Sequence, residues 1–171
     1  ISFNSIENIE GKSCPDDNIN IFFSHGTPES PIRVANNWIR GGGPSSSGGG
    51  ILIGDWGGSH QISENNIVVN PGQYGMGIAG GNNMTVRNNK IYSKQRAFTN
   101  VGMSICNWTQ DSTTGKSYNI RVANNEVNWT HKDGYKNNWW IYKNMAHLTG
   151  LETNKYNSKL NESILPDIII G

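Results

Sequence analysis

The chain has 171 residues, enough for one domain with a substantial core, and its formal net charge of +1 provides no strong field to attract nucleic acid. Hydrophobic residues make up 35% and charged residues 16%, while there are 21 glycines and asparagine is more frequent still. This composition disfavours helices and favours an all-β protein with many tight turns. No apolar run is long enough to cross a membrane, and no basic leader with an apolar segment precedes Ile1, so we expect a mature or excised segment without membrane or nucleic-acid partners.

In chain order, residues 1–11 (ISFNSIENIEG) are expected to form a partial strand, and 18–23 (NINIFF) to form the first strand of a repeating unit. Three glycine-led strands related to it follow at 50–58 (GILIGDWGG), 75–83 (GMGIAGGNN) and 102–109 (GMSICNWT). Each alternates apolar residues with small or polar ones, as expected of a strand with one buried face.

A six-residue motif follows each of these strands, at 34–39 (VANNWI), 62–67 (ISENNI), 86–91 (VRNNKI) and 122–127 (VANNEV). The intervals fall within the roughly 20 to 50 residues typical of solenoid coils. Aligned on apolar positions, the copies give three columns: Val34, Ile62, Val86 and Val122; Asn37, Asn65, Asn89 and Asn125; and Ile39, Ile67, Ile91 and Val127. Stacked coils would bring the asparagines together at a turn, where their amides can form a hydrogen-bonded ladder.

The segment YGMGIAGGNNMTVRNNKIY at 74–92 carries this pattern most fully, and it resembles the repeat of the pectate-lyase-like superfamily. The resemblance implies an all-β, right-handed parallel β-helix of about four to five coils with an asparagine ladder. We expect a single domain across 1–171, with coils at roughly 18–142 and an irregular C-terminal segment at 143–171. Stacking would separate Cys14 from Cys106 by about three coils, so we expect two free thiols.

The candidate carbohydrate-binding residues follow the outward positions of the glycine-led strands. In the expected register Trp56 and Trp108 project from coils about 9.6 Å apart, with Gly80 and Gly81 leaving a gap between them. Aromatic faces stack on sugar rings, and Asp55 and Asn107 would supply hydrogen bonds to hydroxyls. The alternative is that both tryptophans cover glycine-rich surface.

Catalytic candidates are fewer. A lyase requires a basic residue and an acidic calcium site, but Asp55 is the single acid in the outward strand columns, and its equivalents are Gly80 and Asn107. Lys94 and Arg96 could serve as a base or bind a uronate carboxylate; alternatively they are solvated loop charges. His60 aligns with Ile32, Met84 and Ile120, which favours a partly buried structural histidine. Glu64 aligns with Asn36, Asn88 and Asn124, which favours a ladder substitute that bonds neighbouring amides.

The apolar terminus ILPDIIIG must be buried, and we expect it against the side or end of its own β-helix. The alternatives are head-to-tail association with another copy through the open solenoid ends and continuation of a longer parent protein. We therefore predict an extracellular or cell-surface β-helix module that binds polysaccharide without cleaving it. The alternatives are a polysaccharide lyase acting on an acidic glycan and a structural or filament-forming surface protein. We expect no metal or cofactor, with Ca²⁺ required only if the protein is a lyase.

Overall fold

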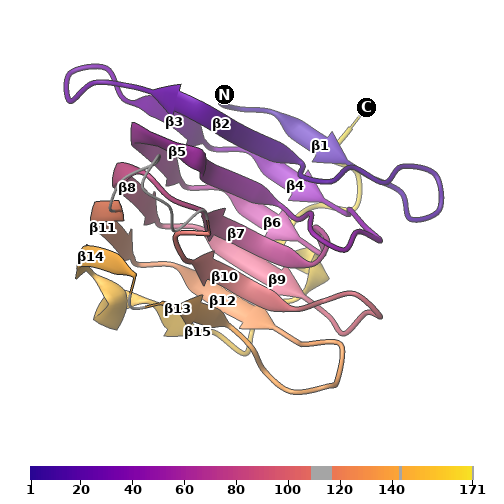
Figure 1. The fold of residues 1–171 in the computed structure, drawn as a ribbon. Coiled ribbons are helices and arrows are strands. Elements are labelled where there is room, and N and C mark those ends of the chain that lie inside the picture. The colour runs from indigo at the N-terminus through magenta and orange to yellow at the C-terminus, as the bar shows by residue number, and fades with distance from the viewer. Residues whose placement is uncertain (109–116, 143, 171) are drawn as a thin grey trace.

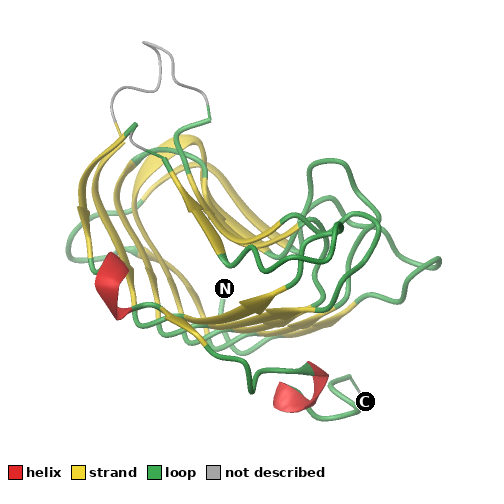
Figure 2. Cartoon of the chain, turned by 90° about the horizontal axis from the view of Figure 1, so that it is seen from below, coloured by secondary structure: helices red, strands yellow, loops and turns green. Residues whose placement is uncertain are grey.

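The chain forms a parallel β-helix in the computed structural model, which describes residues 1–108, 117–142 and 144–170. Strand β1 (Ser5–Glu7) is followed by five coils, each containing strands on three faces (Figures 1 and 2). All strand pairs between successive coils are parallel, which confirms the predicted all-β solenoid. None of the helical turns formed by the described residues has the length and apolarity needed to span a membrane.

Each face contains one strand from every coil. The first face comprises β2 (Ile19–His25), the N-terminal part of β5 (Ile51–Glu64), β7 (Tyr74–Ile78), β10 (Val101–Ile105) and β13 (Trp139–Ile141). The second comprises β3 (Ile32–Ala35), the C-terminal part of β5, β8 (Asn82–Arg87), β11 (Ser117–Ala123) and β14 (Met145–Thr149). The third comprises β1, β4 (Trp38–Arg40), β6 (Ile67–Val69), β9 (Lys90–Ser93), β12 (Glu126–Trp129) and β15 (Lys155–Tyr156). Strands β14 and β15 therefore complete a coil in a segment that we expected to be irregular.

The core is a stack of like residues contributed by all three faces. On the first face the alternation of the glycine-led strands predicts the register correctly, because Ile51, Met76 and Met103 are paired partners and all are buried. The fully buried side chains that continue this core include Val34, Ile39, Ile53, Val68, Ile78, Met84, Val86, Ile91, Ile105, Ile120, Val122, Val127 and Trp129.

On the second face the predicted register of the motif at 62–67 is wrong by one residue. Val34 and Val86 both pair with Ser63, and not with Ile62. Ser63 is fully buried, and its hydroxyl accepts a hydrogen bond from the Asn66 amide. A polar residue therefore occupies an inward position, which an alignment on apolar residues could not detect.

The same one-residue error affects the positions that we predicted for the neighbouring residues of this motif. The ladder asparagine of this coil is Asn66, while Val68 takes the inward place assigned to Ile67. Gln61, fully buried, occupies the column expected for His60. Glu64 is no ladder substitute, because its carboxylate contacts Arg33 and Arg87 of the adjacent coils.

The C-terminal strap, residues 157–170, runs along the outer surface of the third face toward β1, and both termini lie at that end of the stack (Figure 1). Leu165 and Ile169 pack on Val69 of β6, whose neighbour Ile67 is also apolar. The strap includes the short 3₁₀ helix η2 (Glu162–Ile164); another, η1 (Leu151–Thr153), follows β14. The expected burial of the apolar terminus against the side of its own solenoid holds for Leu165 and Ile169, whereas Ile168 and Ile170 are exposed.

Candidate functional site

On the middle coils, the outward positions of the first face carry small or buried side chains. Leu52, Gly77 and Ser104 are paired partners there, and none has a large exposed side chain. The next partner in the same column is Trp140 of the last coil, which is 36% exposed. A large, partly exposed aromatic side chain therefore projects from the first face at the last coil of the solenoid.

These side chains form what we call the aromatic groove, a hollow of about 390 Å³ lined by Ser104, Cys106, Trp108, Trp140 and Tyr142. The Trp140 and Tyr142 rings lie edge to face, with centroids 6.4 Å apart. Burial raises the pKa of the Cys106 thiol, which keeps it in its neutral form. Neither Cys106 nor the exposed Cys14 forms a disulfide, as predicted.

Trp56 and Trp108 each pack against a different aromatic residue, and Trp108 lines the aromatic groove to which Trp56 does not contribute. Trp56 contacts Phe22 of the preceding coil at 6.3 Å between centroids, whereas Trp108 meets Tyr74 edge-on at 6.4 Å. Regular pairing ends with β7 and β10, and the backbone N–H of Trp108 donates to the carbonyl of Ala79 at 2.9 Å. The aligned columns therefore do not extend to Trp108. Trp108 lines a groove, but its aromatic neighbours there belong to the last coil.

Sequence reasoning missed Trp140 and Tyr142, although a signal for them exists. In the segment at 137–143 (NNWWIYK), Ile141 continues the inward column of Ile105. Period-two alternation then directs Trp140 and Tyr142 outward.

Asp55 has a carboxylate neighbour that the sequence did not predict. The side-chain amide of Asn20 donates to Asp55 at 2.9 Å and to Asp17 at 3.0 Å, so the two carboxylates share one nitrogen. Burial raises the pKa of Asp17, which is opposed by hydrogen bonds from the Tyr74 hydroxyl and the Gly49 N–H. Asp17 lies in the loop before β2, outside the strand columns in which a partner for Asp55 was sought.

Asn107 is buried beside the aromatic groove. Its N–H donates to the Asn144 side chain at 3.3 Å, and the Asn144 amide donates to the Asn107 carbonyl at 2.9 Å. These two bonds connect Asn107, which follows β10, to Asn144, which precedes β14 in the last coil.

Two of the three catalytic candidates, Lys94 and Arg96, lie in the loop after β9, and both charges lower the pKa of Glu162. Lys94 forms a 2.8 Å ion pair with Glu162 of the strap, and Arg96 contacts Glu10 while its guanidinium lies 5.2 Å from the centre of the Phe98 ring. His60, half-buried, occupies a left-handed turn with φ of 53° between the first and second faces. His60 belongs to β5, whereas Lys94 and Arg96 follow β9.

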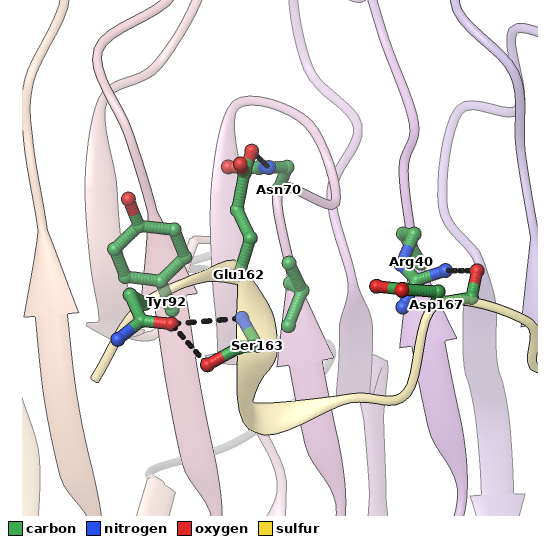
Figure 3. Close-up of a pocket in the computed structure, with 8 residues that line it drawn as sticks. Arg40, Asn70, Tyr92, Glu162, Ser163 and Asp167 are labelled. Carbon is green, nitrogen blue, oxygen red and sulfur yellow. Dashed lines mark hydrogen bonds between the residues drawn. The ribbon is translucent and has the colours of Figure 1, made fainter.

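A second hollow, the strap pocket, lies between the strap and the third face (Figure 3). Its volume is about 490 Å³, and it is lined by Arg40, Val69, Asn70, Tyr92, Asn161, Glu162, Ser163 and Asp167. Its polar groups are engaged with one another: Asn70 donates to Glu162 at 2.7 Å, and Arg40 donates to the Asp167 carbonyl at 2.9 Å. These bonds hold the strap on the solenoid.

No group of three or more histidine, cysteine, aspartate or glutamate side chains within the described ranges could hold a metal ion. Comparisons with protein families, curated proteins and solved structures found no match to this chain.

Proposed function

We propose that the protein is an extracellular or cell-surface β-helix module that binds polysaccharide in the aromatic groove. The observation that carries this proposal is the meeting of Trp108, Trp140 and Tyr142, each 36% to 46% exposed, around one hollow. Aromatic rings set at steep angles can contact the apolar faces of a sugar, while Ser104 offers a hydroxyl to its polar edge. The groove also falls within the roughly 300 to 1,000 Å³ of small-ligand sites.

The surroundings support a site for a chain rather than for a single sugar. The low surface formed by Leu52, Gly77 and Ser104 runs from the groove along the helix axis toward Asn20. A glycan could lie across successive coils there, with Asp55 near its far end. Membership of the pectate-lyase-like superfamily, which the repeat suggests, is part of this proposal.

The test is affinity electrophoresis through gels that contain neutral or acidic polysaccharides. A glycan that retards the wild type should retard Trp140→Ala and Trp108→Ala at least about tenfold less, because each substitution removes one stacking surface. Tyr142→Ala should behave similarly, whereas Tyr118→Ala, which removes a comparably exposed ring from the second face, should retain full binding. Equal retardation of all variants would refute the groove as the site.

A second candidate function is cleavage of the bound glycan by Asp17 and Asp55. Glycoside hydrolysis uses two carboxyl groups that flank the scissile bond, and the shared Asn20 amide holds Asp17 and Asp55 near each other. New reducing ends that disappear in Asp55→Asn, with binding retained, would support hydrolysis. An ultraviolet-absorbing unsaturated uronate would instead support the lyase alternative with Lys94 or Arg96.

A further inference from the structure

A second pair of exposed aromatic rings lies on earlier coils than the aromatic groove. Trp56 of β5 is 54% exposed and Phe22 of β2 is 58% exposed, and their ring centroids lie 6.3 Å apart with the ring planes tilted by 53°. The side chain of Phe22 points outward from the first face, because Ile19 and Ile21 of the same strand are buried. Both rings stand outside the core, so the stacking of the coils does not require them.

Hydrogen-bonding groups lie beside these two rings. Phe22 pairs in register with Asp55, whose carboxylate accepts a hydrogen bond from the exposed Asn20 amide at 2.9 Å. Asp17 accepts from the same amide at 3.0 Å. An aromatic ring can cover the apolar face of a sugar while carboxylate and amide groups beside it bond the hydroxyls. The arrangement therefore has both elements of a sugar subsite.

Tyr74 connects this pair of rings to the aromatic groove. Its ring meets Trp108 edge-on with centroids 6.4 Å apart, and its hydroxyl donates to the Asp17 carboxylate. Trp56 belongs to β5 and Trp140 to β13, which are three strand spacings apart in the first face, or about 14 Å at roughly 4.8 Å for each spacing. A monosaccharide does not span that distance, whereas a chain of several sugars does.

The charges near the two rings disfavour an acidic sugar. Burial raises the pKa of Tyr74, and the negative charges of Asp17, Asp16 and Asp55 raise it further, so these three carboxylates lie close enough to act on one hydroxyl. Among the described residues that line the aromatic groove, none is charged. A uronate or a sulfated sugar would place like charges together on this surface, and a neutral sugar would not.

We propose that Trp56 and Phe22 form a second subsite for the polysaccharide of the aromatic groove, and that this ligand is a neutral chain of several sugars lying along the helix axis. The inference rests on the proposed function. Trp56 stacks on one sugar, Asp55 and Asn20 bond its hydroxyls, and a later sugar of the same chain contacts Trp140. Because one chain occupies both subsites, its affinity exceeds that of a short fragment held by either subsite alone.

The first experiment is affinity electrophoresis with neutral polymers (a glucan, a xylan and a galactomannan) beside acidic ones (polygalacturonate and alginate). We expect the strongest retardation from a neutral polymer, unchanged between low and high salt because contacts between uncharged groups are not screened. Trp56→Ala and Phe22→Ala should each weaken this retardation, Trp56→Ala by about tenfold. The matched control is Trp38→Ala, which removes a 40% exposed indole from the third face and should leave binding unchanged.

The second experiment titrates oligosaccharides of increasing length, prepared from the retarding polymer, into the full chain by calorimetry. Short oligosaccharides fill the aromatic groove alone, so they should bind the wild type and Trp56→Ala equally and bind Trp140→Ala more weakly. Longer oligosaccharides should bind the wild type more tightly, and Trp56→Ala should lose that gain. Urea unfolding midpoints equal to that of the wild type show that the variants are folded.

The outcomes separate this inference from the proposed function. If Trp56→Ala and Phe22→Ala bind every oligosaccharide as the wild type does while Trp140→Ala binds weakly, the second subsite is refuted and the aromatic groove stands. Stronger retardation by an acidic polymer than by any neutral one would overturn the assignment of a neutral ligand. Absence of retardation by every polymer, or retardation that Trp140→Ala does not change, would refute the proposed function and this inference with it.

Discussion

Replacing Asn66 by alanine tests whether the ladder is a main source of stability. Asn66 is fully buried, and its Oδ1 accepts the Asn37 N–H at 3.0 Å and the Asn37 amide at 2.9 Å. Its own amide donates to the Val34 carbonyl and to Asn89. Truncation leaves the Asn37 N–H without its acceptor inside the solenoid, and each buried polar group left unpaired costs about 1 to 3 kcal/mol.

The Asn37 amide retains a bond to the Ile1 carbonyl, so one donor is fully orphaned. Four further groups each lose a partner: the Asn37 amide, the Val34 carbonyl, the Ser63 hydroxyl and Asn89 Oδ1. We therefore expect Asn66→Ala to lower the free energy of unfolding by roughly 2 to 4 kcal/mol, a large part of the about 5 to 15 kcal/mol typical of a domain. Asn4→Ala is the matched control. Asn4 is exposed and no described residue donates to its side chain, so its loss should change the unfolding free energy by only about 0.5 kcal/mol.

Urea unfolding followed by tryptophan fluorescence and circular dichroism measures both variants under the same conditions. A midpoint for Asn66→Ala close to that of Asn4→Ala would refute the reasoning, because it would show that the buried amides are replaceable at no cost.

Three further predictions concern packing and pH. Gly75→Ala should destabilise the protein by about 1 to 3 kcal/mol in urea unfolding, because an added Cβ would lie 2.3 Å from Cγ2 of Ile91 in a closely packed core. The hydrogen bond from Lys94 lowers the pKa of Glu162 below its ordinary 4.5, so strap stabilisation is complete above that value and is lost as the pH falls through the lower folded-state pKa. The protection factors of the strap amides against hydrogen exchange should therefore fall on acidification in the wild type, and Glu162→Gln should remove this dependence. Burial and the nearby Asp17 raise the pKa of Tyr74 well above its ordinary 10.0, so thermal stability should decline as the pH rises past 10 and the unfolded state ionises; a flat profile would contradict this.

The first face could be predicted because its inward residues are apolar in every coil. Ile51, Met76 and Met103 pair as expected, since the alternation of each strand leaves a single register that buries them. The second face could not be predicted equally well, because Gln61 and Ser63 are buried polar residues. Each is satisfied by a hydrogen bond, Gln61 to the Ser24 carbonyl and Ser63 to Asn66, and sequence pattern alone does not record such compensation.

Contacts between distant segments account for the remaining differences. Asp17 meets the Asn20 amide that also bonds Asp55, although Asp17 belongs to a loop. The strap reaches Arg40 from Asp167, across more than a hundred residues of chain. A repeat predicts what lies above and below a residue in the stack, but loops and terminal segments follow no column.

The difference between residues that stacking requires and residues that it does not require also indicates where a binding site should be sought in a solenoid. Asparagine in the ladder and glycine at the close approaches are required by stacking, so their presence says nothing about a ligand. Trp140 occupies a column whose other members on the middle coils are Leu52, Gly77 and Ser104, and stacking does not require an aromatic ring there. Exposed aromatic surface is unfavourable in water unless a partner covers it. Trp108, Trp140 and Tyr142 surround one hollow, and none of these rings is required by the repeat. Their presence at one place, rather than the fold, is the argument for a binding site there.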